Sequence, residues 1–227
     1  SRQLSLMQIR SLIFDLDGTL IDSSDGVVDA VNFAFRQMGL PERAPEIIKP
    51  YIGYPLEGMF ADLTDAPVDQ LYRHFQTRAI DSVVKSSTIL PEVSQVLMEL
   101  RAQGYQMAIA TTKIRIHVEA IVRKFGWEGL FDAYVAGNDV GKVKPDPEAI
   151  LLSIKRLGSH AADSLVIGDT ENDILAAQGV PTRVVAVSSP YGGDQRVKAL
   201  NPDFSISSLS QLIPILDRAN GKTTVTT

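Results

Sequence analysis

Two acidic residues near the start of the chain have the type and spacing to do chemistry. Asp15 and Asp17 stand two residues apart, directly after the apolar run 9–14. Such a run predicts a buried strand of a parallel sheet, and ligands of these sheets bind beyond the carboxyl ends of the strands. Two carboxylates crowded at that point repel each other unless a cation or a proton intervenes. Gly18 then allows the backbone to turn sharply after the two acids. The repulsion between the carboxylates is the reason to expect a metal ion at this strand end.

Three further clusters carry hydroxyls, lysines and acids. They are Ala110-Thr111-Thr112-Lys113, Lys142-Val143-Lys144-Pro145-Asp146-Pro147 and Gly168-Asp169-Thr170-Glu171-Asn172-Asp173. The first and the third follow short apolar runs, so in a parallel sheet they would emerge at the same edge as Asp15. Carboxylates suit Mg²⁺, whereas hydroxyls, backbone N–H groups and lysine suit phosphate oxygens. A carboxylate beside the metal can attack phosphorus, and a second carboxyl group can move the proton.

The elements that must position these clusters alternate along the chain. Short apolar runs predict strands at 9–14, 106–110, 133–136, 164–167, 183–187 and 204–206, with helical periodicity between most of them. Helices are predicted at 91–101 and from about Asp146, where Asp is a good cap and Pro a good first residue. This alternation predicts an α/β fold with a Rossmann-like, doubly wound parallel sheet.

One stretch breaks the alternation. From about residue 23 to 87 the pattern is helical and shows no convincing buried strand. We therefore expect an inserted all-helical cap domain at 22–88, with hinges near 21–24 and 88–91. The α/β core would comprise 9–21 and 89–218, and residues 1–8 and 219–227 would be loose termini.

Composition excludes several classes of protein. The 227 residues are 44% hydrophobic, which is enough for a large core, and the net charge of −5 offers no basic footprint for nucleic acid. No apolar run is long enough to span a membrane. The absence of cysteine excludes disulfides and thiolate chemistry, and it fits a cytoplasmic location. Oligomeric state, monomer or dimer, stays open.

Taken together in this order, the four clusters resemble the haloacid dehalogenase superfamily of phosphatases, with a helical cap after the first motif. Within it, the cap stretch Tyr51-Ile52-Gly53-Tyr54-Pro55-Leu56 is similar to that of the phosphoglycolate phosphatase group. The resemblance implies that Asp15 is the nucleophile that becomes phosphorylated and that Asp17 is the general acid and base. It also implies Mg²⁺ as the cofactor.

The same resemblance implies roles for the other motif residues. Thr111, with the backbone of Thr112, would bind the phosphoryl group, and Lys144 would neutralise it. The metal ligands would be Asp15, Asp17 through its carbonyl, Asp169 and Asp173. Asp173 could act directly or through the metal's waters, or it could instead hold the lysine or simply cap its helix. Gly18, Thr19, Tyr51 and Gly53 complete the candidate phosphate- and substrate-binding set.

The function predicted is hydrolysis of a small-molecule phosphomonoester, because Asp17 supplies the acid that an alkoxide leaving group needs, and the resemblance implies a phosphoglycolate-like substrate. A sugar phosphomutase is the first alternative, although no arginine follows Gly53 as it usually does in β-phosphoglucomutases. A pyrophosphatase, a nucleotidase and a non-catalytic phosphate-binding regulator remain open. Lys113 and Lys142 are expected to face solvent, and His74, His117 and His160 to have surface or packing roles.

Overall fold

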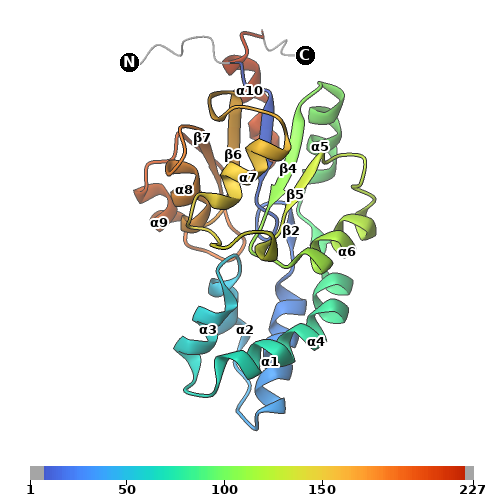
Figure 1. The fold of residues 1–227 in the computed structure, drawn as a ribbon, viewed down its shortest axis with the longest axis vertical. Helices are drawn as coiled ribbons and strands as arrows, with labels where there is room; N and C mark the ends of the chain where they lie inside the picture. The colour runs from blue at the N-terminus through green and yellow to red at the C-terminus, as the bar shows by residue number, and fades with distance from the viewer. Residues whose placement is uncertain (1–7, 223–227) are drawn as a thin grey trace.

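The computed structural model describes residues 8–222, drawn in Figure 1. The strands are β1 (Ser11–Phe14), β2 (Ile21–Asp22), β3 (Thr88–Ile89), β4 (Gln106–Ala110), β5 (Ala133–Val135), β6 (Ser164–Gly168), β7 (Arg183–Val187) and β8 (Phe204–Ile206). The α-helices are α1 (Ser24–Gln37), α2 (Pro45–Ile48), α3 (Leu56–Leu63), α4 (Val68–Ser86), α5 (Val93–Ala102), α6 (Arg115–Phe125), α7 (Glu148–Arg156), α8 (Glu171–Gln178), α9 (Asp194–Ala199) and α10 (Leu212–Ala219). Short 3-10 turns lie at Lys49–Tyr51, Gly137–Asp139, Ala161–Asp163 and Leu209–Gln211.

Six strands form one parallel sheet in the order β5-β4-β1-β6-β7-β8. In this register Phe14, the last residue of β1, lies opposite Ile109 of β4 and Ile167 of β6. The carboxyl ends of these three strands are therefore neighbours, and β1 lies between the other two. The predicted doubly wound parallel sheet is confirmed. β1 begins at Ser11 rather than at residue 9, because the backbone of Ile9 pairs with the side chain of Asn220 instead.

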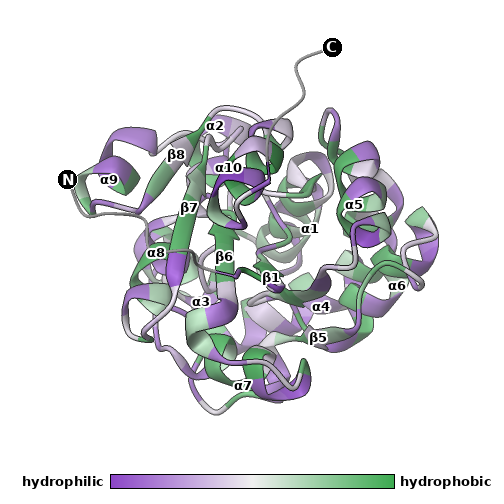
Figure 2. Cartoon of the chain, turned by 90° about the horizontal axis from the view of Figure 1, so that it is seen from above, coloured by the Kyte–Doolittle hydropathy of each residue, from purple (hydrophilic) through white to green (hydrophobic). Residues whose placement is uncertain are grey.

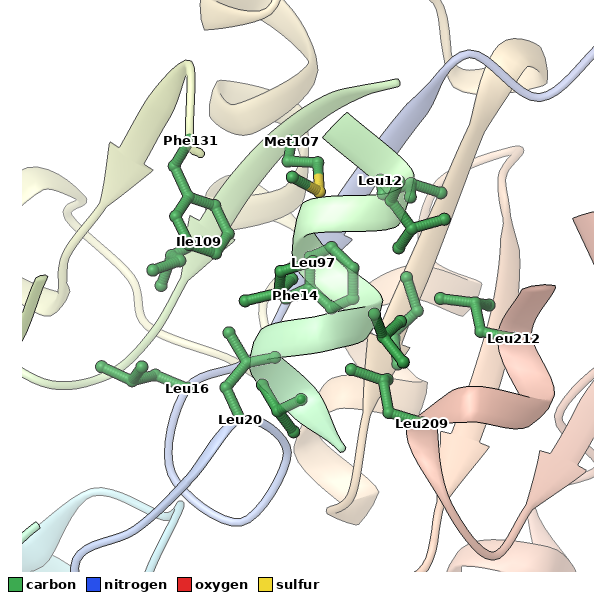
Figure 3. Packing of buried hydrophobic residues seen from close by; sticks show 14 of the residues in the cluster. Leu12, Phe14, Leu16, Leu20, Leu97, Met107, Ile109, Phe131, Leu209 and Leu212 are labelled. Carbon is green, nitrogen blue, oxygen red and sulfur yellow. The ribbon is translucent and has the colours of Figure 1, made fainter. Parts of the chain in front are cut away.

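Alternate residues of the sheet pack on opposite faces. Leu12 and Phe14 join the apolar cluster under α5, α6 and α10, whereas Ile13 joins the cluster under α7 and α8. Figure 3 shows Leu97 of α5 lying over the first face, close to Phe14. In Figure 2 the central strands are mostly hydrophobic, and the surrounding helices carry both hydrophobic and hydrophilic residues. Burial on both faces holds the strand ends, and with them the site, in fixed positions.

The helical insert has an apolar core of its own. Helices α1 to α4 lie below the sheet in Figure 1 and bury a cluster that includes Phe35, Phe60 and Phe75, whose rings meet edge to face. The insert joins the sheet domain through β2 and β3, which pair antiparallel with each other. These two-residue strands coincide with the predicted hinges. Sequence periodicity could not reveal them, because two residues carry no period.

The predicted loose termini fall mostly on residues 1–7 and 223–227, which lie outside the described residues. For the described part of the C-terminal segment the prediction is wrong, because Ala219 ends α10 and Asn220 is held in place. The Asn220 side chain bonds the backbone of Ile9 and the hydroxyl of Tyr105. No helix among residues 8–222 is both long enough and apolar enough to cross a bilayer.

Candidate active site

Three sequence clusters meet at the carboxyl end of β1. Asp15 follows β1, and its backbone N–H donates to the Ile167 carbonyl at 2.9 Å. Lys144, from the loop between β5 and α7, places its Nζ 3.0 Å from Asp15 Oδ1 and 2.6 Å from Asp173 Oδ1. The Lys144 ammonium also donates to the Ala110 carbonyl at the end of β4. Because Lys144 is only 2% exposed, it forms a fixed positive charge at the centre of the cluster.

The buried charges do not balance. Asp15, Asp169 and Asp173 are three buried carboxylates within reach of one another, and Lys144 is the ammonium between them. Burial, together with the charge of Asp173, raises the pKa of Asp15 despite the opposing pull of Lys144. Burial and Asp173 likewise raise the pKa of Asp169. Burial alone would lower the pKa of Lys144, but the two carboxylates that it contacts raise the pKa above its usual value. The cluster thus favours an additional cation.

Two carboxylate oxygens are available for that cation. Asp15 Oδ2 and Asp169 Oδ2 are buried and have no hydrogen-bond partner among the described residues. The other oxygen of Asp169 accepts a hydrogen bond from Thr19 Oγ1 at 3.0 Å, which orients the carboxylate. Buried unpaired oxygens are costly, and hard carboxylate oxygens are the ligands that Mg²⁺ prefers. The residues present therefore fit a divalent cation.

Asp173, predicted as a metal ligand or as the residue that holds the lysine, lies with Asp15 and Asp169 in the carboxylate cluster and contacts Lys144 directly. Its Oδ1 accepts from Lys144 Nζ, and its Oδ2 accepts from the backbone N–H groups of Asp169 and Thr170 and from the Thr170 hydroxyl. This carboxylate caps α8 while it positions Lys144. Both oxygens have hydrogen-bond partners, in contrast to Asp15 Oδ2 and Asp169 Oδ2.

Gly18 brings the chain against the acidic cluster. Its φ is +84°, and a Cβ atom built on it would lie 2.1 Å from Asp169 Oδ2. We therefore expect Gly18→Ala to lower the free energy of unfolding by about 1–3 kcal/mol more than Gly39→Ala does. Gly39 is the matched control, since its φ is also positive, at +68°, but a Cβ there would meet nothing within 4 Å. Urea denaturation measures both, and equal losses would contradict the close approach.

Asp17 lies beside the cluster and has its own partners. Its Oδ1 accepts from Ser23 Oγ in the hinge, and its Oδ2 lies 3.5 Å from Lys113 Nζ. The prediction that Lys113 faces solvent is wrong, because this side chain is only 10% exposed and turns towards Asp17. Ser23 was missed entirely, and a serine at a hinge gives no sequence signal of such a contact. Lys142 is exposed, as predicted.

The second cluster and the cap loop complete the site. Thr111 is buried at the end of β4, and its Oγ accepts from the Lys113 backbone, so its hydroxyl hydrogen is free to donate. Thr112 and Gly53 line the cavity between cap and core. The predicted contact of Tyr51 is not found, because this side chain bonds Asp62 within the cap and does not line the cavity.

Fold and site together define an α/β enzyme core with an acidic centre at one edge of a parallel sheet and a helical cap beside it. The model of the family described as haloacid dehalogenase-like hydrolase matches residues 12–187, and the chain belongs to this family. This confirms the resemblance seen in the sequence and the predicted class, a hydrolase of the phosphatase type.

Curated relatives and solved structures are similar to this chain over nearly its whole length. The pyrophosphatase PpaX of Bacillus mycoides (strain KBAB4) is 32% identical over 218 residues, which cover 95% of this chain and 100% of the relative. A haloacid dehalogenase-like hydrolase structure from Bacteroides fragilis has 31% identity and a TM-score of 0.83, covering 90% of this chain and 99% of its own. A protein described as a predicted phosphoglycolate phosphatase from Haemophilus somnus 129PT has 26% identity and a TM-score of 0.83, with 93% and 99% covered.

Proposed function

We propose that the protein is a Mg²⁺-dependent phosphatase that hydrolyses a small-molecule phosphomonoester through an aspartyl phosphate on Asp15. The observation that carries the proposal is that the two oxygens of the Asp15 carboxylate have different surroundings. Lys144 holds one oxygen at 3.0 Å, and the other oxygen is buried without a partner beside the unpaired oxygen of Asp169. A carboxylate fixed in this way can approach an anionic phosphoryl group, because cations offset the repulsion.

In the first step the Asp15 carboxylate attacks phosphorus, and the bond from phosphorus to the leaving oxygen breaks. Asp17 gives its proton to that oxygen. In the second step Asp17 takes a proton from water, which attacks phosphorus and releases phosphate from Asp15. Lys144 and the free hydroxyl hydrogen of Thr111 stabilise the charge on the phosphoryl oxygens in both steps.

The carboxylates of Asp15 and Asp169, with the backbone carbonyl of Asp17, would hold the metal ion. Mg²⁺ there supplies positive charge that offsets the repulsion between Asp15 and the phosphoryl group. Two other side chains position these groups: Asp173 holds Lys144, and Thr19 orients Asp169.

Hydrolysis of a generic aryl phosphate tests the proposal. We expect turnover with Mg²⁺, loss of turnover after chelation, and recovery when Mg²⁺ is restored. Mg²⁺ should also raise the thermal midpoint, because it binds the folded state and relieves the carboxylate repulsion. Asp169→Asn should lose this rise, whereas the control Asp69→Asn, at an exposed position of α4, should keep it. Full turnover by metal-stripped protein in excess chelator would contradict the proposal.

A second candidate substrate is inorganic pyrophosphate. Curated relatives that are 32% identical over 94–95% of this chain are named pyrophosphatases, and the same steps would apply with phosphate as the leaving group. Phosphate release from pyrophosphate and from aryl phosphate, compared as kcat/KM, separates the two candidates. Release of little free phosphate from a hexose 1-phosphate, with isomerisation of that sugar phosphate, would instead indicate a mutase.

A further inference from the structure

A cavity of about 230 Å³ lies between the cap and the core, and it begins at the group that would protonate the leaving oxygen. Asp17 lines this cavity, whereas Asp15 does not. From the core, Lys113 and His117 line it, and from the cap, Phe75 and Gln76 of α4. A substrate whose phosphorus lies at Asp15 would therefore place its leaving group in this cavity.

The charges in the cavity wall disfavour a second anion. The charged residues that line it are Asp17, Glu57 and Lys113, which is two carboxylates against one ammonium. The Lys113 ammonium already forms an ion pair, because its Nζ lies 3.5 Å from Asp17 Oδ2 and both side chains are about nine-tenths buried. A carboxylate or a second phosphate on the substrate would be buried without a cation of its own, which is costly.

His117 does not supply the missing charge. This residue of α6 is only 4% exposed. Burial, helped by the nearby ammonium of Lys113, lowers the pKa of the imidazole to about 4, against the weaker opposing effect of Asp17. At neutral pH His117 is therefore uncharged, and it can offer a substrate one hydrogen bond but no positive charge.

Much of the remaining wall is apolar, and one of its buried polar atoms has no hydrogen-bond partner among the described residues. Val27, Ile52, Tyr54, Leu56, Phe75 and Ile114 all line the cavity. Gln76 lines the same wall, and its Oε1 atom is buried and has no hydrogen-bond partner among residues 8–222. A buried acceptor of this kind favours a ligand that brings a donor. The volume is sufficient, since a cavity of about 150 Å³ is enough to hold a benzene ring.

We propose that the substrate is a monophosphate whose leaving group is an uncharged, largely apolar alcohol or phenol with one hydrogen-bond donor for Gln76. This inference rests on the proposed function, and it narrows the substrate class. It argues against the second candidate, pyrophosphate, and against the phosphoglycolate-like substrate that the sequence resemblance implies, because the leaving group of each carries a negative charge.

A pair of substrates that differ in charge tests the inference. 4-(Hydroxymethyl)phenyl phosphate and 4-carboxyphenyl phosphate have leaving groups of similar size and similar acidity. We expect the neutral substrate to have a kcat/KM at least about tenfold higher, corresponding to about 1.4 kcal/mol, and to exceed 2-phosphoglycolate and pyrophosphate as well. Equal values, or a preference for any of the anionic substrates, would overturn the inference and leave the proposed function standing.

A substitution in the wall provides the second test. Gln76→Lys places an unpaired ammonium in the cavity and should shift the ratio of the two kcat/KM values at least about tenfold towards the carboxylate. The same change at the exposed Gln70, also on α4, is the matched control and should leave the ratio unchanged. The ratio within one variant is independent of how much protein folds. An unchanged ratio in Gln76→Lys would overturn the inference. If the unsubstituted protein turned over none of these substrates, the proposed function would be overturned with it.

Discussion

Asp15→Asn is expected to lower kcat for an aryl phosphate about 10⁴-fold or more, because the variant lacks the nucleophile. The free energy of unfolding should stay the same or rise. The carboxylate of Asp15 is buried beside two others, and burial together with Asp173 already disfavours its charge. A neutral amide of the same shape removes that repulsion. Kinetics and urea denaturation of the same preparation measure the two effects separately.

The matched control for this change is Asp81→Asn. Asp81 lies on the outer side of α4, where it pairs with Lys85 at 3.5 Å and both side chains are more than two-thirds exposed. The control should keep its activity within about twofold, because exposed pairs of this kind contribute little. Substantial turnover by Asp15→Asn, or an equal loss in the control, would refute the assignment of Asp15.

Lys144→Met is expected to have the second large effect, on stability as well as activity. The ammonium of Lys144 is the counter-charge of the buried carboxylates Asp15 and Asp173 and also bonds the Ala110 carbonyl. Its removal leaves buried charges unpaired, which typically costs about 3–5 kcal/mol. We expect a loss of that size in urea denaturation without added metal, together with loss of phosphatase activity.

Two further variants make this prediction specific. Lys142→Met removes an exposed lysine from the same loop and should change the free energy of unfolding by less than about 0.5 kcal/mol. Adding Asp173→Asn to Lys144→Met removes one of the stranded carboxylates and should recover part of the lost stability, because the two residues are in contact. A cost below about 1 kcal/mol for Lys144→Met would show that the lysine does not balance the cluster.

The sequence was sufficient to predict the centre of the site because a parallel sheet brings distant residues together by rule. Asp15, Thr111 and Asp169 each follow a buried strand, and strands β4, β1 and β6 are neighbours. Once the sheet is predicted, the meeting of these residues follows. Helices α1 and α4 of the insert were predictable for a different reason, since amphipathic periodicity over many residues is a strong signal.

Side-chain directions outside the strands could not be predicted in this way. Lys113 lies in the turn between β4 and α6, where no periodicity indicates which way a side chain points, and it turns towards Asp17. Tyr51 and Gly53 are close in the chain, yet Tyr51 bonds within the cap and Gly53 lines the cavity. Several roles were open for Asp173, and only the structure shows that it contacts Lys144 and caps α8.

Detection of the covalent intermediate is the most direct test of the central claim. The protein, saturated with Mg²⁺ and an aryl phosphate, is quenched with acid within the first turnover, reduced with borohydride and mapped by peptide mass spectrometry. Borohydride converts an aspartyl phosphate to homoserine, and we predict homoserine at position 15 and at no other aspartate. Release of phosphate at the full rate with Asp15 unmodified, or with the modification at another residue, would contradict the account.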